Sequence, residues 1–290
     1  MPTRRKPAAW LDRAGLRRFL RAALAEDVGR GDITSRGLFK PDDRAAGRFI
    51  CRAGGVIAGL PVVAELYRLV DRRVRFVTRV RDGALVAPGT VIATAAGPVR
   101  ALLTAERLAL NILQHLSGIA TVTRRFVRAA AGTRAAIVDT RKTVPGMRLL
   151  AKYAVRAGGG KNHRMGLYDQ FLVKDNHADL LARAGRRLDL AGLRSRAPKG
   201  TILAVEARTR AEVTAYLPAR PDIILLDNMP PARVAALAAF IRREAPGTLI
   251  EASGGITLAN VRAYAVAGAD RISIGALTHS APALDIAFDA

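Results

Sequence analysis

The fold is decided by short apolar runs that end in polar residues, of which DIILLDN (residues 222–228) is the clearest. A helical segment follows, and LIEASGG (residues 249–255) then repeats the pattern. Further out along the chain, similar runs lie at 135–138, 171–173, 201–205 and 271–274. Buried strands that alternate with helices are typical of parallel β/α units. The sequence therefore predicts an incomplete α/β barrel, because the region of about 113–280 is shorter than the usual ~250 residues.

The chain before residue 112 has a different pattern. Between residues 48 and 100, β-like runs separated by Gly and Pro predict a small antiparallel sheet with a helix near 61–69. Helical spacing predicts another helix over 11–24, and a long helix is expected to begin at Thr104 as its N-cap. The long helix has a buried stripe, Leu108, Ile112, Leu116, Ile119 and Thr123, and a polar stripe, Arg107, Asn111, Gln114 and Gly118. The polar stripe is either a solvated face or a functional one.

Composition limits the classes of function. The 290 residues carry 40 Arg, 7 Lys, a formal net charge of +23 and a single cysteine, Cys51. This charge favours anionic partners, namely acidic metabolites, phosphates or nucleic acid. The Arg residues are scattered and aromatic residues make up only 5%, so a basic nucleic-acid-binding protein is the weaker interpretation. We expect no membrane span, no secretory signal, a cytoplasmic location and a disordered basic tail over the first ten residues.

Polar or charged side chains follow nearly every predicted strand. These strand-end residues are Arg141, Lys142, Lys174, Asp175, Glu206, Asp227 and Ser253. In an α/β barrel the carboxyl ends of the strands form the active site. A Gly-rich loop over 158–167 adds His163 and Arg164 to the cations, and a pocket with so many cations predicts a polyanionic ligand. The sequence contains no evident nucleophile–base pair, zinc-ligand spacing or P-loop ending.

Two other groups of strand-end residues indicate a phosphate and a metal. The turns Ser253-Gly254-Gly255 and Gly275-Ala276 follow the last two strands, where barrels often bind phosphate, although they could be ordinary turns. Glu206 and Asp227 end neighbouring strands and could hold Mg²⁺, stabilise a cationic transition state, or simply form salt bridges.

At these residues the sequence resembles the quinolinate phosphoribosyltransferase family over almost its whole length. The segments that carry the resemblance are EDVGRGDITS (26–35), ERLALN (106–111), LSGIAT (116–121), DTRKTVPG (139–146), KYAV (152–155), NHR (162–164), KDNH (174–177), LDNM (226–229), the Ser253 loop and GALTHS (275–280). The resemblance implies an N-terminal α/β sandwich domain, residues 1–112 joined by 281–290, and an incomplete seven-stranded α/β barrel, residues 113–280. It also implies a homodimer, with a higher oligomer open, in which Arg107 enters the partner's site.

The resemblance implies a reaction between quinolinate and 5-phosphoribosyl 1-diphosphate, giving nicotinate mononucleotide, pyrophosphate and CO₂ in NAD biosynthesis. Quinolinate would be held by Arg107, Thr140, Arg141, His163, Arg164 and Lys174. Phosphate groups would bind Lys142, Ser253, Gly254, Gly255, Gly275 and Ala276. Lys142, Lys174, Glu206 and Asp227 would be the catalytic residues, with Glu206 and Asp227 also serving Mg²⁺.

One position departs from the family pattern. The family usually has an acidic residue two positions after Glu206, where this chain has Arg208. Arg208 either adds a cation near the site or only alters the exit of the strand. A paralogue associated with molybdenum transport tends to lose parts of the His-Arg and Lys-Asp-Asn-His motifs, which are intact here. That paralogue, a phosphoribosyltransferase for another pyridine acid such as nicotinate, and the nucleic-acid-binding protein remain alternatives.

Overall fold

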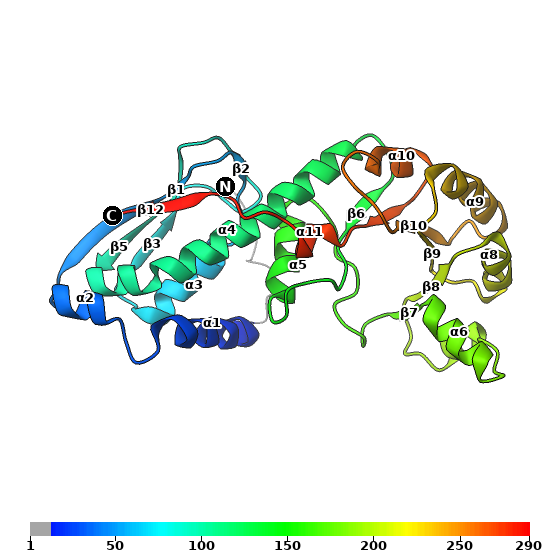
Figure 1. Ribbon diagram of the computed structural model, residues 1–290, viewed down its shortest axis with the longest axis horizontal. Helices are drawn as coiled ribbons and strands as arrows, with labels where there is room; N and C mark the ends of the chain where they lie inside the picture. Colours follow the sequence, from blue (N-terminus) through cyan, green and yellow to red (C-terminus); the bar gives the residue numbers. More distant parts are fainter. Residues whose placement is uncertain (1–12) are drawn as a thin grey trace. The chain divides into compact units, whose positions relative to one another are not determined.

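The computed structural model describes residues 13–290, which cluster into two compact units (Figure 1). The first unit contains the chain through Thr121 together with 145–158 and 281–290, and the second contains 122–144 and 159–280. The predicted basic tail lies outside the described residues. No helix in the described part of the chain is long and apolar enough to cross a membrane.

The first unit contains a four-stranded antiparallel sheet in the order β12-β1-β5-β3. Its strands are β1 (Arg44–Cys51), β3 (Arg75–Thr78), β5 (Thr90–Pro98) and β12 (Ile286–Asp289), and a two-stranded sheet joins β2 (Gly55–Val56) to β4 (Leu85–Val86). The helices are α1 (Arg13–Val28), α2 (Ile33–Leu38), α3 (Leu60–Val70), α5 (Arg148–Ala157) and most of α4 (Val99–Ala129). The aromatic rings of Phe49, Tyr67, Phe76 and Phe288 pack together in its core. The predicted small antiparallel sheet and the helix near 61–69 are thus confirmed.

Helix α4 differs from its predicted form at two points. It begins at Val99, directly after β5, so the prediction that Thr104 is its N-cap is wrong. The predicted apolar stripe is buried from Leu108 to Thr123, as expected. In the polar stripe, Arg107 and Asn111 are exposed but Gly118 is buried, and a Cβ there would lie 2.0 Å from the carbonyl oxygen of Pro282. Gly118 therefore belongs to a packed contact and not to a solvated face.

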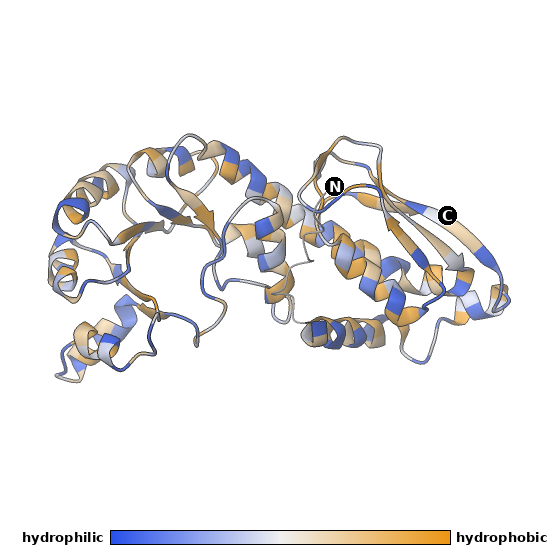
Figure 2. Cartoon of the chain, turned by 180° about the vertical axis from the view of Figure 1, so that it is seen from behind, coloured by the Kyte–Doolittle hydropathy of each residue, from blue (hydrophilic) through white to orange (hydrophobic). Residues whose placement is uncertain are grey.

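The second unit contains a six-stranded parallel sheet in the order β6-β11-β10-β9-β8-β7. Its strands are β6 (Ala136–Val138), β7 (Phe171–Val173), β8 (Leu203–Ala207), β9 (Ile223–Asp227), β10 (Leu249–Ser253) and β11 (Arg271–Ser273). Its helical segments are α6 (Asp175–Arg183), α7 (Leu190–Ser195), α8 (Arg210–Tyr216), η1 (Leu217–Ala219), α9 (Pro231–Glu244), α10 (Val261–Val266) and α11 (Ala276–His279). All six predicted runs are strands, and hydropathy colouring shows apolar residues along them and polar residues on the outward sides of the helices (Figure 2).

The described sheet has six strands where the family resemblance implies seven. Beyond edge strand β6, Lys161 forms only an isolated parallel bridge with Val138. The segment that makes this bridge follows the Gly158–Gly160 run, and Gly is a weak strand former. Backbone pairing at this edge therefore stays local and does not extend into a strand.

Candidate active site

The strand-end residues of the second unit line one cavity of about 490 Å³. Eleven of the predicted site residues are in its wall: Thr140, Arg141, Lys142, His163, Arg164, Lys174, Glu206, Asp227, Ser253, Gly254 and Gly255. Asp175, Asn228, Glu251, Leu172, Leu225 and Ser273 complete the lining. Parallel strands in register place these residues together, because Asp227 pairs with Ser253 and Ser253 with Ser273 across β9, β10 and β11.

Three predicted site residues are not in that wall. Gly275 and Ala276 lie at the start of α11, and Arg107 is exposed on α4 in the first unit. Gly275 still shapes the site, since a Cβ at this position would lie 2.9 Å from the Cδ atom of Lys142. The glycine leaves room for the Lys142 side chain.

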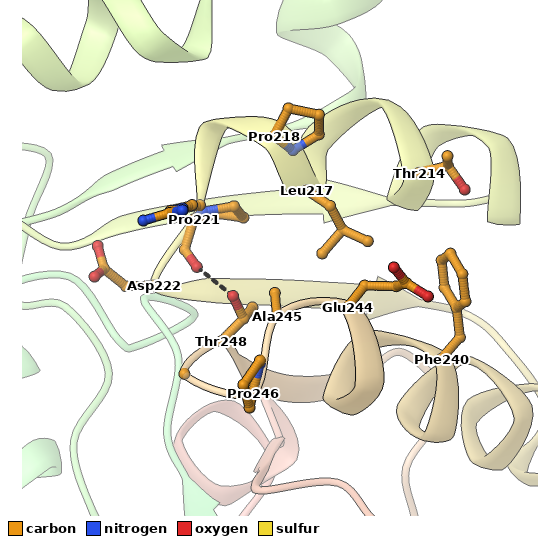
Figure 3. Close-up of a pocket in the computed structure, with 12 residues that line it drawn as sticks. Thr214, Leu217, Pro218, Pro221, Asp222, Phe240, Glu244, Ala245, Pro246 and Thr248 are labelled. Atoms are coloured by element: carbon orange, nitrogen blue, oxygen red, sulfur yellow. Dashed lines mark hydrogen bonds between the residues drawn. The ribbon is translucent and has the colours of Figure 1, made fainter.

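A larger hollow of about 750 Å³ lies at the other end of the same sheet (Figure 3). It is lined by residues that precede β9 and β10, including Pro221, Asp222 and Thr248, and by Phe240 and Glu244 of α9. It contains none of the predicted site residues. Size alone therefore does not identify the site, whereas position at the carboxyl ends of the strands does.

The strands alternate between the cavity and the helical layer. Leu225 and Asp227 of β9 line the cavity, and so do Glu251 and Ser253 of β10. The intervening residues, Leu226 and Ala252, are fully buried on the opposite face. This period of two explains why each of these largely apolar strands places two side chains in the cavity wall.

One side of the cavity carries cations that the fold holds firmly. Arg164 is 9% exposed, and its Nη1 atom donates a hydrogen bond to the Gln170 carbonyl at 3.3 Å. Burial lowers the pKa of Arg164, and the positive charge of Arg141 lowers it further. Two cations crowded together at a buried site create a strong attraction for an anion.

Lys142 and Lys174 are positioned through their backbones. The Lys142 N–H donates to the Thr140 hydroxyl at 3.0 Å, and the Thr278 hydroxyl donates to the Lys142 carbonyl at 2.7 Å. Lys174 is the N-cap of α6, and its N–H donates to Nδ1 of His177 at 2.9 Å. Thr140 therefore orders the turn that presents Lys142.

The acidic residues occupy neighbouring strand ends. Burial raises the pKa of Glu206, and the charges of Asp227 and Asp175 raise it further. Three carboxylates that repel one another suit a hard divalent cation, which takes oxygen ligands. No cluster of three or more potential metal ligands is assembled in the described residues. Glu206 and Asp227 fit Mg²⁺ in the way that ion often binds, with few protein carboxylates and substrate phosphates completing its shell.

The turn after β10 has a backbone that only glycine adopts readily. Gly254 and Gly255 have φ values of 91° and 60°, in the left-handed region that favours glycine. A Cβ on Gly254 would lie 2.1 Å from Oδ1 of Asn228. Asn228 also has a positive φ of 50°, donates its N–H to the Ser253 carbonyl and donates its amide to Asp227 at 2.6 Å. Asn228 thus links the glycine turn to the acidic residues.

The sequence analysis did not single out three polar residues that support the site. Asp139 accepts hydrogen bonds from the side chain of Asn162 and the N–H of His163, while Asn228 and Glu251 line the cavity. Glu251 was read only as part of a strand. The signal available in the sequence was its spacing of two residues from Ser253, together with the presence of a charge in an otherwise apolar strand.

Arg208 is bound away from the cavity. Its guanidinium contacts Asp179 and Glu212 at 3.1 Å, and Asp175 at 4.0 Å. The hydrogen bonds that the guanidinium donates to Asp179 and Glu212 raise the pKa of Arg208. The residue therefore joins the exit of β8 to α6 and α8 and is not in the cavity lining.

Comparison with known proteins agrees with this architecture. Residues 32–117 match the quinolinate phosphoribosyl transferase N-terminal domain model, and residues 119–289 match the C-terminal domain model. The nicotinate-nucleotide pyrophosphorylase [carboxylating] of Mycobacterium leprae is 45% identical over 93% of this chain and 95% of its own length. A probable enzyme of the same name from Synechocystis is 42% identical over 92% of this chain and 90% of its own.

A solved structure is similar over nearly the entire chain. NadC from Streptococcus pyogenes superimposes with a TM-score of 0.87 and 38% sequence identity, covering 95% of each chain. The two domain models together with these relatives place the sequence without ambiguity. The chain belongs to the quinolinate phosphoribosyl transferase family.

Proposed function

We propose that this chain transfers the 5-phosphoribosyl group of 5-phosphoribosyl 1-diphosphate to quinolinate, forming nicotinate mononucleotide, pyrophosphate and CO₂ in de novo NAD biosynthesis. The observation that carries the proposal is one cavity with Arg141, Arg164 and Lys174 in the wall that also contains the acidic residues and the glycine turn. Such a wall suits a dicarboxylate and a phosphorylated sugar side by side. The family and the printed names of the relatives support the same reaction.

Each part of the cavity has a distinct task in this reaction. Arg141, Arg164 and Lys174 neutralise the two carboxylates of quinolinate and hold the ring nitrogen toward the sugar. The Ser253-Gly254-Gly255 turn receives the 5-phosphate, with Gly275 and Ala276 beside it. Thr140 contributes to the quinolinate side, and Lys142 lies on the diphosphate side. Glu206 and Asp227 would hold Mg²⁺, which, when bound, neutralises diphosphate charge.

The chemistry follows from this placement. The ring nitrogen donates its electron pair to C1 of the ribose while the C1–oxygen bond breaks and pyrophosphate leaves with those electrons. Glu206 and Asp227 stabilise the positive charge that develops on the sugar. The pyridinium ring then accepts the electrons of the C–CO₂ bond, CO₂ departs, and the ring carbon takes a proton.

The assembly of the chain is part of the proposal. The six-stranded sheet would curve as an incomplete barrel, with 1–112 and 281–290 as a sandwich domain and 113–280 as the barrel domain. The protein would work in the cytoplasm as a homodimer in which Arg107 of one chain completes the quinolinate pocket of the other. The exposed position of Arg107 on α4 supports this arrangement, since a cation on an exposed helix face is available to another chain.

A direct assay tests the function. Purified protein is mixed with Mg²⁺, 5-phosphoribosyl 1-diphosphate and quinolinate, and nicotinate mononucleotide and CO₂ are followed, with nicotinate as a parallel substrate. We expect product and stoichiometric CO₂ from quinolinate alone. Turnover of nicotinate alone would instead identify a phosphoribosyltransferase for another pyridine acid. A folded protein that turns over neither acid would favour the molybdenum-associated paralogue or a nucleic-acid-binding role.

A further inference from the structure

Glu251 is a fully buried carboxylate at the floor of the cavity. It lies in β10, one inward position before Ser253, with Leu225 of β9 and Arg271 of β11 as its partners in the strand register. Its side chain is 0% exposed. A charge that is removed from water in this way persists only when neighbouring groups compensate it.

Two side chains compensate Glu251. The Nε atom of Arg271 lies 2.9 Å from one carboxylate oxygen, and Nε2 of His163 lies 3.2 Å from the other. Burial by itself would raise the pKa of Glu251, but His163 and Arg271 outweigh burial and lower it. Glu251 is therefore an anion whose charge is balanced by Arg271, and its second oxygen is directed at His163.

The hydrogen bonds of His163 fix which ring nitrogen carries the proton. The backbone N–H of Arg164 donates to Nδ1 of His163 at 2.7 Å. A backbone N–H can only donate, so Nδ1 must present a lone pair, and the ring proton must be on Nε2, facing Glu251. A ring held in this way is neutral and adds no positive charge to the pocket.

Asp139 also holds the loop that carries His163 and Arg164. The His163 N–H donates to Asp139 at 2.9 Å, and the Asn162 side chain donates to the second oxygen of Asp139 at 2.5 Å. Asp139 follows β6, whereas Glu251 belongs to β10, so the loop that carries Arg164 is held from two separate strands. The His163 ring is the link between the carboxylate of β10 and the backbone of Arg164.

We propose that Glu251 is a positioning residue: it holds His163 as the neutral Nε2–H tautomer, and the His163 ring in turn sets the backbone of Arg164 and so the geometry of the dicarboxylate pocket. The proposal rests on the proposed function, because it names quinolinate as the ligand whose affinity depends on Glu251. It separates two tasks of the loop. Arg164 supplies the positive charge, and His163 fixes the position of the Arg164 backbone.

Two double variants separate positioning from charge balance. Glu251→Met/Arg271→Met removes both buried charges and leaves His163 without an acceptor. Glu251→Gln/Arg271→Met removes the same charges but keeps an amide oxygen for the His163 Nε2–H, so it is the matched control. Calorimetric binding of quinolinate and of 5-phosphoribosyl 1-diphosphate is measured separately for each folded protein, with the unmodified protein alongside.

We expect the Met/Met variant to bind quinolinate about tenfold more weakly or worse, because His163 loses the carboxylate that lies 3.2 Å from its Nε2 atom. Its affinity for 5-phosphoribosyl 1-diphosphate should change less than about twofold. The Gln/Met variant should recover most of the quinolinate affinity. Equal quinolinate binding by the Met/Met variant and the unmodified protein would overturn the proposal. Equal weakness of both variants would overturn it as well, since Glu251 would then act through its charge.

A measurement of the His163 tautomer in the unmodified protein tests the proposal even if the variants do not fold. The chain has four histidines, so ¹⁵N-histidine NMR spectra can be assigned with His163→Gln as a reference. A proton on Nε2 and a bare Nδ1 are expected at neutral pH. An imidazolium or an Nδ1–H tautomer at His163 would refute the positioning role. If the unmodified protein binds no quinolinate, the proposed function fails, while the tautomer still reports on Glu251.

Discussion

At the scale of single residues, the cavity owes its selectivity to the environment of each charge. Arg164 is a buried cation beside another cation, and Glu206 is a half-buried anion beside two other anions. In both cases burial and a neighbouring like charge destabilise the charged form of the side chain. Substrates of opposite charge relieve that repulsion, so binding free energy is available to orient the two reactants.

The first prediction concerns the cations. Arg141→Ala and Arg164→Ala should each raise the KM for quinolinate by about 30-fold or more, because each removes a charge-assisted contact to a carboxylate. Arg243→Ala is the matched control, since that side chain is 69% exposed, contacts Glu244 and the Phe240 ring, and is not in the cavity lining. Steady-state kinetics with quinolinate varied at saturating 5-phosphoribosyl 1-diphosphate provide the measurement. An unchanged KM in both variants would place the acid pocket elsewhere.

The site residues that could be predicted from the sequence are those that directly follow a predicted strand. Asp227 and Ser253 could be predicted because a polar residue that follows an apolar run can be recognised in the sequence itself. The partnership of Asp139 with the His163 loop could not, because it joins β6 to a distant loop. Arg208 could not be placed either, because its partners Asp179 and Glu212 come from two different helices.

At the scale of elements, α4 shows why helix starts are harder to predict than helix faces. Its buried stripe follows from spacing alone, but its first residue is set by β5, which ends at Pro98 immediately before it. Thr104 lies inside the helix, and its hydroxyl donates to Asp32 at 3.2 Å. Asp32 is itself the N-cap of α2. A residue type that usually begins a helix here connects two helices.

The second prediction uses two glycines in helices. Gly118→Ala should lower the free energy of unfolding by about 2 kcal/mol or more, because its Cβ would overlap the Pro282 backbone. Gly37→Ala in α2 meets nothing within 4 Å and should raise it by about 0.5 kcal/mol through helix propensity. Urea unfolding of both variants is the measurement. Stabilisation by both substitutions would show that the Pro282 backbone moves away from the added Cβ of residue 118 without a free-energy cost.

The third prediction concerns the junction of α1 and α3. Burial would raise the pKa of Glu65, but Arg17 at 2.6 Å and Arg68 at 3.0 Å outweigh burial and lower it below 4.5. The stabilisation is therefore present above pH 4.5 and is lost as the pH falls through the lowered pKa. Glu65→Gln should cost about 1–2 kcal/mol at pH 7 and progressively less in acid.

Denaturant titrations at pH 7 and at stepwise lower pH provide the test. Asp71→Asn is the comparison variant, because the side chain of its partner Arg73 is 54% exposed and such pairs contribute little. A cost at Glu65 that stays constant with pH would show that its ion pairs do not account for the lowered pKa.

At the scale of the whole molecule, the way in which the chain passes between the two units could not be predicted from local sequence patterns. Local patterns predicted a mixed α/β protein and all six parallel strands, since each strand is a contiguous run. They did not predict that 145–158 would cluster with the first unit. That clustering depends on contacts such as the Tyr153 hydroxyl with Asp82, which also accepts the N–H groups of Gly59 and Leu60. Such long-range contacts leave no periodic signal.

The fourth prediction tests the shared site. Arg107→Ala and Glu206→Gln should each abolish most activity as homodimers. Mixing the two proteins under conditions of subunit exchange should restore about a quarter of the normal activity, because half of the dimers are hybrids and each hybrid has one intact site. Recovery is followed by quinolinate turnover, with each variant exchanged against itself as the control. Absence of recovery, despite hybrids seen by native mass spectrometry, would place Arg107 in its own chain's site.

The pairing of β12 with β1 has a consequence for biosynthesis. β1 ends at Cys51, and its partner β12 begins only at Ile286, more than 200 residues later in the chain. At about 5–20 residues per second, a ribosome needs on the order of ten seconds or more to translate the intervening sequence. During that time one edge of β1 has no native partner, and it gains one only after β12 has been synthesised and has left the ribosome. A nascent-chain chaperone that covers this edge would protect the protein until β12 is available.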